Sequence, residues 1–267
     1  MKLEYKGKKW DKEVARIQKY LKEIKGVFNN NELFTINEFL NSEVKDYLRL
    51  YCCLSNNYEC MAAHHYLNDV MSHEVIKYTY FSGYAMLITK CLFEQGVRTE
   101  YNVIVENAIK AGMDYALFQL IAVDEIENPY IKILDNDLIM LMYYQKYEQA
   151  RLVLSQLPDD PDESSEVYYV SPEFLKKMYL AIIEHDEKSF NEELAKRIKK
   201  YRKNMVGYST IIDVVSIALI KMAEREGIHC KVDVIEIPRQ FFDGTCKIDK
   251  DKDKLPFYDE FLELGII

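Results

Sequence analysis

Glycine, proline and tryptophan are scarce in this sequence. Its 267 residues include 9 Gly, 6 Pro and a single Trp. Turn-rich β proteins use many Gly and Pro residues, so this composition argues against them and favours long helices with short connections. No apolar run reaches about 18 residues, so no membrane span is expected. The basic start MKLEYKGKKW is not followed by the apolar stretch of a secretory signal.

Motifs of catalysis are also missing. The sequence has no Gly-rich phosphate loop and no GxSxG elbow, so we predict no enzymatic activity and no cofactor. An enzyme of unrecognised type would need a deep pocket in which Cys52, His64 or His65 and carboxylates converge. Adjacent Cys52-Cys53 suits a disulfide framework poorly, and reduced thiols in a cytoplasmic protein are the simpler interpretation.

Two groups of potential metal ligands differ from the patterns of known metal sites. His64-His65 lies near Cys52, Cys53 and Cys60, but the gaps differ from those of zinc sites and no second pair follows. Asp249, Asp251, Asp253 and Glu260 match four positions of a calcium loop, yet Lys254 replaces the required Gly and Pro256 replaces an aliphatic residue. We therefore interpret the first group as packing and the second as a solvated loop, and expect no metal.

Apolar residues recur at helical spacing along most of the chain. Ser55-Asn56-Asn57, Gly96, Gly112 and Gly227 are the predicted breaks. The expected single helices cover 10–25, about 35–54, 58–70, 74–95, 100–111, 114–123, 135–144, 146–156 and 211–226. A helical hairpin is expected over 173–203, with its turn at His185-Asp186. The segment YDEFLELGII is expected to form a last short helix or a docked tail. The alternation in CKVDVIEI predicts one short extended segment near 230–237, ended by Pro238.

This pattern predicts an all-α fold of irregular antiparallel helical hairpins, similar to tetratricopeptide-type arrays and α-solenoids. The stretch LPDDPDESSE at 157–166 is the clearest loop. It separates an N-terminal helical region, 1–156, from a C-terminal one, 167–267. We expect the two regions to pack as one continuous domain across this loop.

The charge is acidic and unevenly distributed. The net charge is −9, although residues 1–25 hold nine basic and four acidic residues, which leaves 26 basic and 40 acidic residues elsewhere. Such a body repels nucleic acid and attracts a basic protein. The basic run of Lys196, Arg197, Lys199, Lys200, Arg202 and Lys203 fits the C-terminal end of a helix better than a nucleic-acid contact.

The acidic loop is the best candidate for a partner-binding site, because carboxylates steer a basic partner and adjacent aromatic residues can anchor it. An ordinary solvated loop is the alternative. The 21 Tyr residues of the chain likewise suit either interfaces or packing. The predicted binding residues are Asp159, Asp160, Asp162, Glu163, Glu166, Tyr168 and Tyr169.

The segments YLAIIEHDEKSFNEELAKRIKKYRKN and STIIDVVSIALIKMAEREGIHCKVDVIEIPRQFF carry a resemblance. Over about 174–240, roughly a quarter of the chain, they resemble the end of immunity-protein family forty-nine of bacterial polymorphic toxin systems. The resemblance implies a cytoplasmic protein that neutralises a cognate toxin, for example a nuclease, by stoichiometric occlusion, without catalytic residues. The alternative is a helical-repeat adaptor or regulator that binds an endogenous protein or peptide. The oligomeric state stays open.

Overall fold

The computed structural model describes residues 32, 34–68, 72–126, 137–159, 170–204, 211–232, 234, 236–244 and 247–259. A helix over residues 34–41 comes first. It is followed by α2 (Tyr47–Asn68), α3 (His73–Glu94), α4 (Asn102–Ala122), α5 (Leu138–Tyr143), α6 (Tyr147–Ser155), α7 (Pro172–Ile183), α8 (Glu187–Asn204), α9 (Val214–Arg225) and the 3-10 turn η3 (Arg239–Phe241). No strand occurs in these ranges, and the predicted all-α fold is confirmed.

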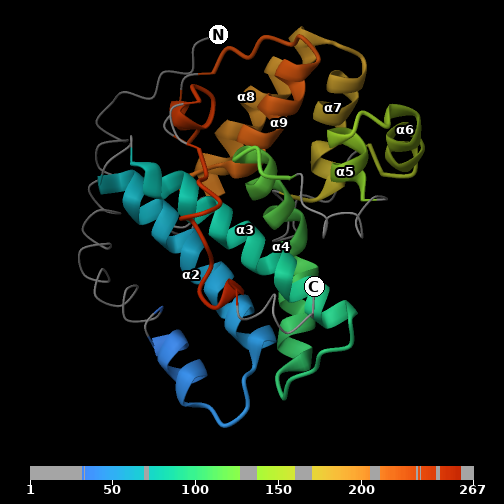
Figure 1. Ribbon diagram of the computed structural model, residues 1–267. Helices are drawn as coiled ribbons and strands as arrows, with labels where there is room; N and C mark the ends of the chain where they lie inside the picture. The colour runs from blue at the N-terminus through green and yellow to red at the C-terminus, as the bar shows by residue number, and fades with distance from the viewer. Residues whose placement is uncertain are drawn as a thin grey trace.

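The helices pack mainly against their neighbours in the chain. Helices α2 and α3 form an antiparallel pair, α4 packs on α3, and α9 packs on α4 (Figure 1). The hairpin of α7 and α8 lies beside the short pair α5–α6 (Figure 1). Because α4 contacts α2, α3, α5 and α9, it connects the early helices to the late ones. None of the described helices has both the length and the apolar character needed to cross a membrane.

Several tyrosines belong to the hydrophobic core, which runs without a break through these helices. Their rings supply much of the buried area, so packing accounts for a good part of the unusual Tyr content. The buried tyrosines are Tyr51, Tyr58, Tyr66, Tyr80, Tyr84, Tyr179 and Tyr201.

Helix α2 runs through the predicted break at Ser55-Asn56-Asn57, and that prediction is wrong. The buried stripe of Leu48, Tyr51, Leu54, Tyr58 and Met61 continues across these residues at helical spacing. Polar side chains that favour turns in isolation are tolerated inside a helix when tertiary packing selects the helix.

The predicted helix end at Gly112 is also wrong, because α4 is one continuous helix. Its buried residues Val105, Ile109, Met113 and Ala116 recur every three or four positions on both sides of the glycine. The predicted helix over about 35–54 is instead interrupted at residues 42–46. There the Lys45 ammonium donates to the carbonyls of Phe39 and Leu40, which satisfies the end of the preceding helix.

Other sequence predictions are confirmed. Gly96 and Gly227 follow α3 and α9 with φ values of 87° and 77°, as glycines do after a helix. The predicted hairpin appears as α7 and α8, joined at His185-Asp186.

No strand forms among the described residues of the segment 230–237, which instead leads into η3. The predicted helix 10–25 lies outside the described residues.

The segment 247–259 crosses the α2–α3 pair (Figure 1). The Tyr51 hydroxyl donates to the Pro256 carbonyl at 3.1 Å, and the hydroxyls of Tyr84 and Tyr258 are 2.9 Å apart. Phe257 packs on Phe39, with ring centroids 4.9 Å apart. This late part of the chain therefore closes over the earliest described helices.

The contact between α3 and α4 depends on Gly83. A Cβ at this position would lie 2.9 Å from the Ala116 carbonyl oxygen, which is backbone and cannot rotate away. At Gly112 a Cβ would instead meet the flexible end of Met86 at 3.3 Å. The two glycines therefore differ in how well they accept a methyl group.

We predict that Gly83→Ala lowers the free energy of unfolding by about 1–3 kcal/mol, because α3 and α4 must separate. Gly112→Ala is the matched control, since it gains helix propensity of up to about 1 kcal/mol and displaces only a methionine end. Urea unfolding followed by circular dichroism compares them. Equal stability of the two variants would show that the close approach at Gly83 is not a constraint.

Candidate functional site

Asp159 is the one predicted binding residue that lies within the described residues. Asp160, Asp162, Glu163, Glu166, Tyr168 and Tyr169 lie outside them, so the predicted domain boundary at this loop stays a prediction. The Asp159 side chain is 89% exposed. The acidic run therefore begins at the surface of the molecule.

The start of this loop is fixed by Lys176 of α7. This side chain is 11% exposed, and its ammonium donates to the Leu157 carbonyl and to the Asp159 carboxylate, each at 2.7 Å. The ion pair also lowers the pKa of Asp159. A buried lysine with two oxygen partners holds the backbone where the acidic run leaves α6.

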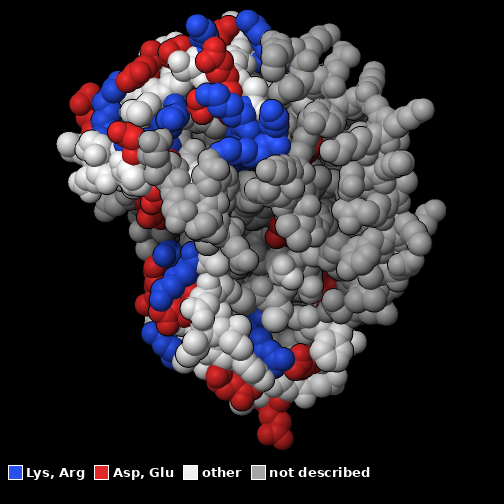
Figure 2. Space-filling view, turned by 180° about the vertical axis from the view of Figure 1, so that it is seen from behind, with Lys and Arg blue, Asp and Glu red and all other residues white. Residues whose placement is uncertain are grey.

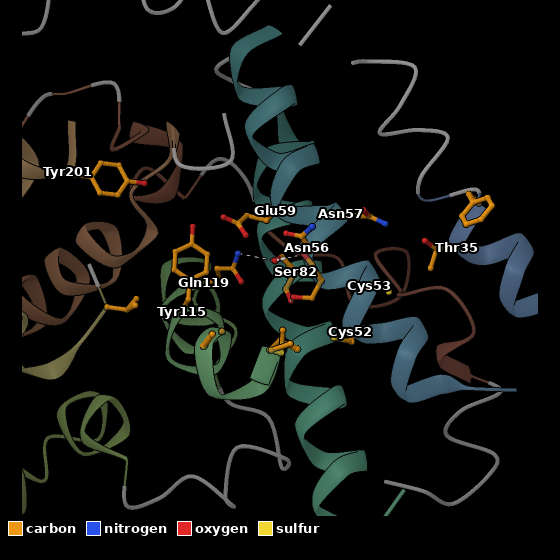
Figure 3. A pocket seen from close by; sticks show the side chains of 17 residues that line it. Thr35, Cys52, Cys53, Asn56, Asn57, Glu59, Ser82, Tyr115, Gln119 and Tyr201 are labelled. Carbon is orange, nitrogen blue, oxygen red and sulfur yellow. Dashed lines mark hydrogen bonds between the residues drawn. The ribbon is translucent and has the colours of Figure 1, made fainter. Parts of the chain in front are cut away.

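A pocket of about 820 Å³ opens between α2, α3, α4 and α8 (Figure 3). This volume is within the range of small-molecule sites in proteins. Its apolar lining comes from Phe34, Met86, Ala108, Ala111, Gly112 and Val170. Its polar lining comes from Thr35, Cys52, Cys53, Ser55, Asn56, Asn57, Glu59, Ser82, Tyr115, Gln119 and Tyr201.

One wall of the pocket is a closed hydrogen-bond network. The Ser55 hydroxyl donates to the Ser82 carbonyl at 2.9 Å, and the Ser82 hydroxyl donates to the Ser55 carbonyl at 2.8 Å. The Gln119 amide donates to the Ser82 hydroxyl at 3.0 Å. These bonds join α2, α3 and α4, so this wall is rigid.

Glu59 is the charged group of the pocket. Its carboxyl lies near Tyr115 and Tyr201, which come from α4 and α8 and turn toward the same space (Figure 3). Burial raises the pKa of Glu59 to about 7, and a hydrogen bond with Tyr115 opposes part of the rise. Burial raises the pKa of Tyr115 and of Tyr201 well above the ordinary value. Near neutral pH, Glu59 is therefore the group of these three that changes its charge.

Glu59 is not among the residues predicted from the sequence, although the sequence contains a signal for it. It is the only Asp, Glu, Lys or Arg between Arg49 and Asp69. A single charged residue in a long uncharged helical stretch indicates a side chain that lies in the interior or in a pocket and not on an ordinary solvated helix face. Tyr115 and Tyr201 carry no comparable signal, since they are two of 21 tyrosines.

The pocket contains part of the set that the enzyme hypothesis requires. Cys52 and Cys53 line it together with Glu59, but His64 and His65 are not among its described lining residues. The His65 ring stacks on Tyr78, with centroids 5.2 Å apart. Burial raises the pKa of Cys52 to about 11, which keeps it a thiol at neutral pH.

A buried ion pair supports the α8 side of the pocket. The Arg197 guanidinium donates to the Asp213 carboxylate at 2.9 Å and to the Ser216 hydroxyl at 3.0 Å. Ser216 in turn donates to Asp213 at 2.6 Å. The Arg197 and Asp213 side chains are 8% and 1% exposed. The Arg197 guanidinium lies 5.9 Å from the centroid of the Tyr201 ring, and the Tyr201 hydroxyl donates to the Ile212 carbonyl at 3.4 Å. These contacts position the ring.

The basic run of α8 is thus divided between the interior and the surface. Arg197 belongs to the buried pair, whereas Lys196 forms a surface pair with Glu193 at 2.7 Å. On the face seen in Figure 2, acidic and basic side chains are interspersed over much of the described surface, with one compact group of basic atoms near the top.

Two carboxylates of the calcium-like run, those of Asp249 and Asp253, have protein partners. Asp253 accepts from the Asp249 backbone at 2.8 Å and lies 3.3 Å from the His73 ring. Asp249 pairs with Lys252 at 2.9 Å. Glu260 lies outside the described residues, and within them no cluster of three or more His, Cys, Asp or Glu residues is arranged to hold a metal.

The five described cysteines, Cys52, Cys53, Cys60, Cys91 and Cys230, are free thiols.

Comparison of the chain with models of protein families, with curated proteins and with solved structures found no match. The function is therefore inferred from the residues and their geometry.

We predict that Arg197→Met lowers the free energy of unfolding by about 3–5 kcal/mol, because it leaves the Asp213 carboxylate buried without its partner. Arg151→Met is the control. It breaks the pair with Glu184, whose side chains are 41% and 54% exposed, and is expected to cost less than about 1 kcal/mol. Urea unfolding measures both. A loss for Arg197→Met no larger than the control's would contradict a supporting role for the buried pair.

Proposed function

We propose that this protein is a cytoplasmic immunity protein that binds a cognate bacterial toxin and neutralises it by stoichiometric occlusion. The acidic loop beginning at Asp159 is the proposed contact with a basic region of the toxin, for which a nuclease is the proposed class. Charge attraction speeds such an encounter, and aromatic residues that lose water at the interface slow dissociation.

The observation that carries this proposal is the anchoring of the loop by Lys176. The Lys176 side chain is 11% exposed and holds the Asp159 carboxylate, which is 89% exposed. This pair fixes the start of the acidic run and leaves the Asp159 side chain accessible. Fixing a loop reduces the conformational entropy that is lost on binding. An anchored acidic run is thus better suited to capture a basic partner than an untethered one.

The segment that resembles the immunity family supports the same proposal. Its residues, about 174–240, form most of α7, then α8, α9 and η3. Helices α7 and α8 form a hairpin, and α7 also contacts α9. Since α7 supplies Lys176, the same group of helices carries both the resemblance and the anchor of the acidic loop.

The alternative function is a helical-repeat adaptor that binds an endogenous protein or peptide. The succession of α5, α6, α7 and α8, each packed on the next, favours it, because stacked hairpins present extended binding surfaces. The two functions differ in the partner. An immunity protein is required only when its toxin is present, whereas loss of an adaptor alters normal growth.

We predict that charge reversal to Lys at Asp160, Asp162 and Glu163 lowers the association rate for the partner about tenfold at low salt and flattens its salt dependence, because the steering field is reversed. Asp159 is kept in this variant so that the pair with Lys176 survives. Adding Asp159→Lys should lower the rate further. Stopped-flow or surface-binding kinetics over a range of salt concentrations provide the measurement.

A variant with Glu100, Glu148 and Asp251 changed to Lys is the control. It makes the same change in net charge at exposed positions that are far apart in the chain. It should retain most of the association rate. If both variants lose the same amount, general charge rather than the loop governs capture, and unchanged kinetics in the loop variant remove the loop from the interface.

The partner can be identified by a tagged pull-down from the native cell with the neighbouring gene co-expressed. A one-to-one complex with a neighbour-encoded protein that is toxic alone is the expected result. Recovery of housekeeping partners with a harmless neighbour would favour the adaptor.

A further inference from the structure

We infer that the pocket between α2, α3, α4 and α8 binds a small organic cation with an apolar body, of the alkylammonium class, and that Glu59 is its counter-ion. The inference does not depend on the proposed partner.

The charge of the pocket points to a cation. Among the described residues, Glu59 forms no ion pair with a Lys, Arg or His, whereas the buried Asp213 is neutralised by Arg197. Glu59 is only partly exposed, and a carboxylate that loses much of its water without gaining a basic partner is costly unless a counter-charge or a proton reaches it. An ammonium group entering the pocket would supply that charge.

The walls around Glu59 suit such a ligand. Tyr115 and Tyr201 place aromatic rings beside the carboxyl, and ring faces attract ammonium groups. Phe34, Met86 and Ala108 give the pocket an apolar surface for the hydrocarbon part of the ligand. One acid, two aromatic rings and an apolar cavity together form a complementary site for an amphiphilic amine.

Other chemical classes fit this pocket less well. An anionic ligand would meet the Glu59 carboxylate, and the described lining residues include no Lys or Arg to offset it. A neutral apolar ligand would displace water from the carboxyl without replacing its hydrogen bonds. The pocket should therefore select by the charge of the ligand's polar end.

The experiment compares n-octylamine, n-octanol and octanoate, which share a chain length and differ in the charge of the polar end. Isothermal titration of the full-length protein at pH 8 is expected to give saturable binding of octylamine at least tenfold tighter than octanol, with octanoate weakest. Equal affinities for the three probes, or no saturable binding of octylamine at millimolar concentration, would overturn the inference.

Glu59→Gln tests the role of the carboxylate at nearly constant shape. It is expected to weaken octylamine at least tenfold and to leave octanol binding within about twofold, which also reports that the pocket is intact. Ala108→Phe, which fills the cavity, should weaken both probes. Retention of full octylamine affinity in Glu59→Gln would show that Glu59 is not the counter-ion.

The pH dependence gives an independent readout. Octylamine stays protonated from pH 6 to 8, as lysine does, whereas Glu59 must lose its proton to pair with it. Because the folded pKa of Glu59 is raised to about 7, octylamine affinity should rise about tenfold from pH 6 to pH 8 in the natural protein. Glu59→Gln should show little of this rise, and an equal rise there would contradict the assignment.

Tyr115 on α4 and Tyr201 on α8 lie near this carboxyl, and Cys52 and Cys53 of α2 also line the pocket. Arg197, Asp213 and Glu236 lie around the two tyrosines. The two tyrosines keep their protons throughout this pH range because their pKa values are raised well above 10. Arg197 and Asp213 neutralise each other. Glu59→Gln keeps all of these neighbouring groups, so the part of the pH-dependent rise that this variant loses reports on Glu59.

Discussion

The packing of α3 between α2 and α4 is the constraint on which the rest of the structure depends. On one side, Ser55 and Ser82 exchange hydrogen bonds between the backbones of α2 and α3. On the other, Gly83 lets the backbone of α4 come within contact distance. These small residues let α2, α3 and α4 pack closely, and the pocket lies beside this contact.

The sequence predicted the class of the fold because that class is encoded locally. Few Gly and Pro residues and regular apolar spacing are sufficient for helices, and the glycines after α3 and α9 mark true helix ends. The same local rules fail at Ser55-Asn56-Asn57 and Gly112. At those positions contacts between distant helices decide the conformation: Ser55 is satisfied by Ser82, and Gly112 makes room for Met86.

The pocket could not be predicted for a related reason. Its charged and aromatic residues, Glu59, Tyr115 and Tyr201, are far apart in the sequence and follow no motif. Only the isolation of Glu59 in an uncharged stretch marked it as unusual. The acidic loop was recognisable from composition, but its anchor, Lys176, was not, because a lysine on an apolar helix gives no sign that it is buried.

The two proposed sites use carboxylates in opposite ways. At the loop the acids are in water, where their field reaches a large partner at a distance but salt screens it. In the pocket a single, mostly buried acid is screened less by salt, and its interactions depend on whether it holds a proton. Ligand in the pocket would contact α4 and α8, and α4 also contacts α9 and α5.

The closure of residues 247–259 over α2 and α3 has a consequence for biosynthesis. Tyr51 reaches a carbonyl 205 positions later, and Tyr84 a hydroxyl 174 positions later. On the ribosome, the α2–α3 pair emerges early but waits for nearly the whole chain before these contacts can form. The first helices must therefore persist for many seconds with the faces that Phe257 and Tyr258 later cover still exposed.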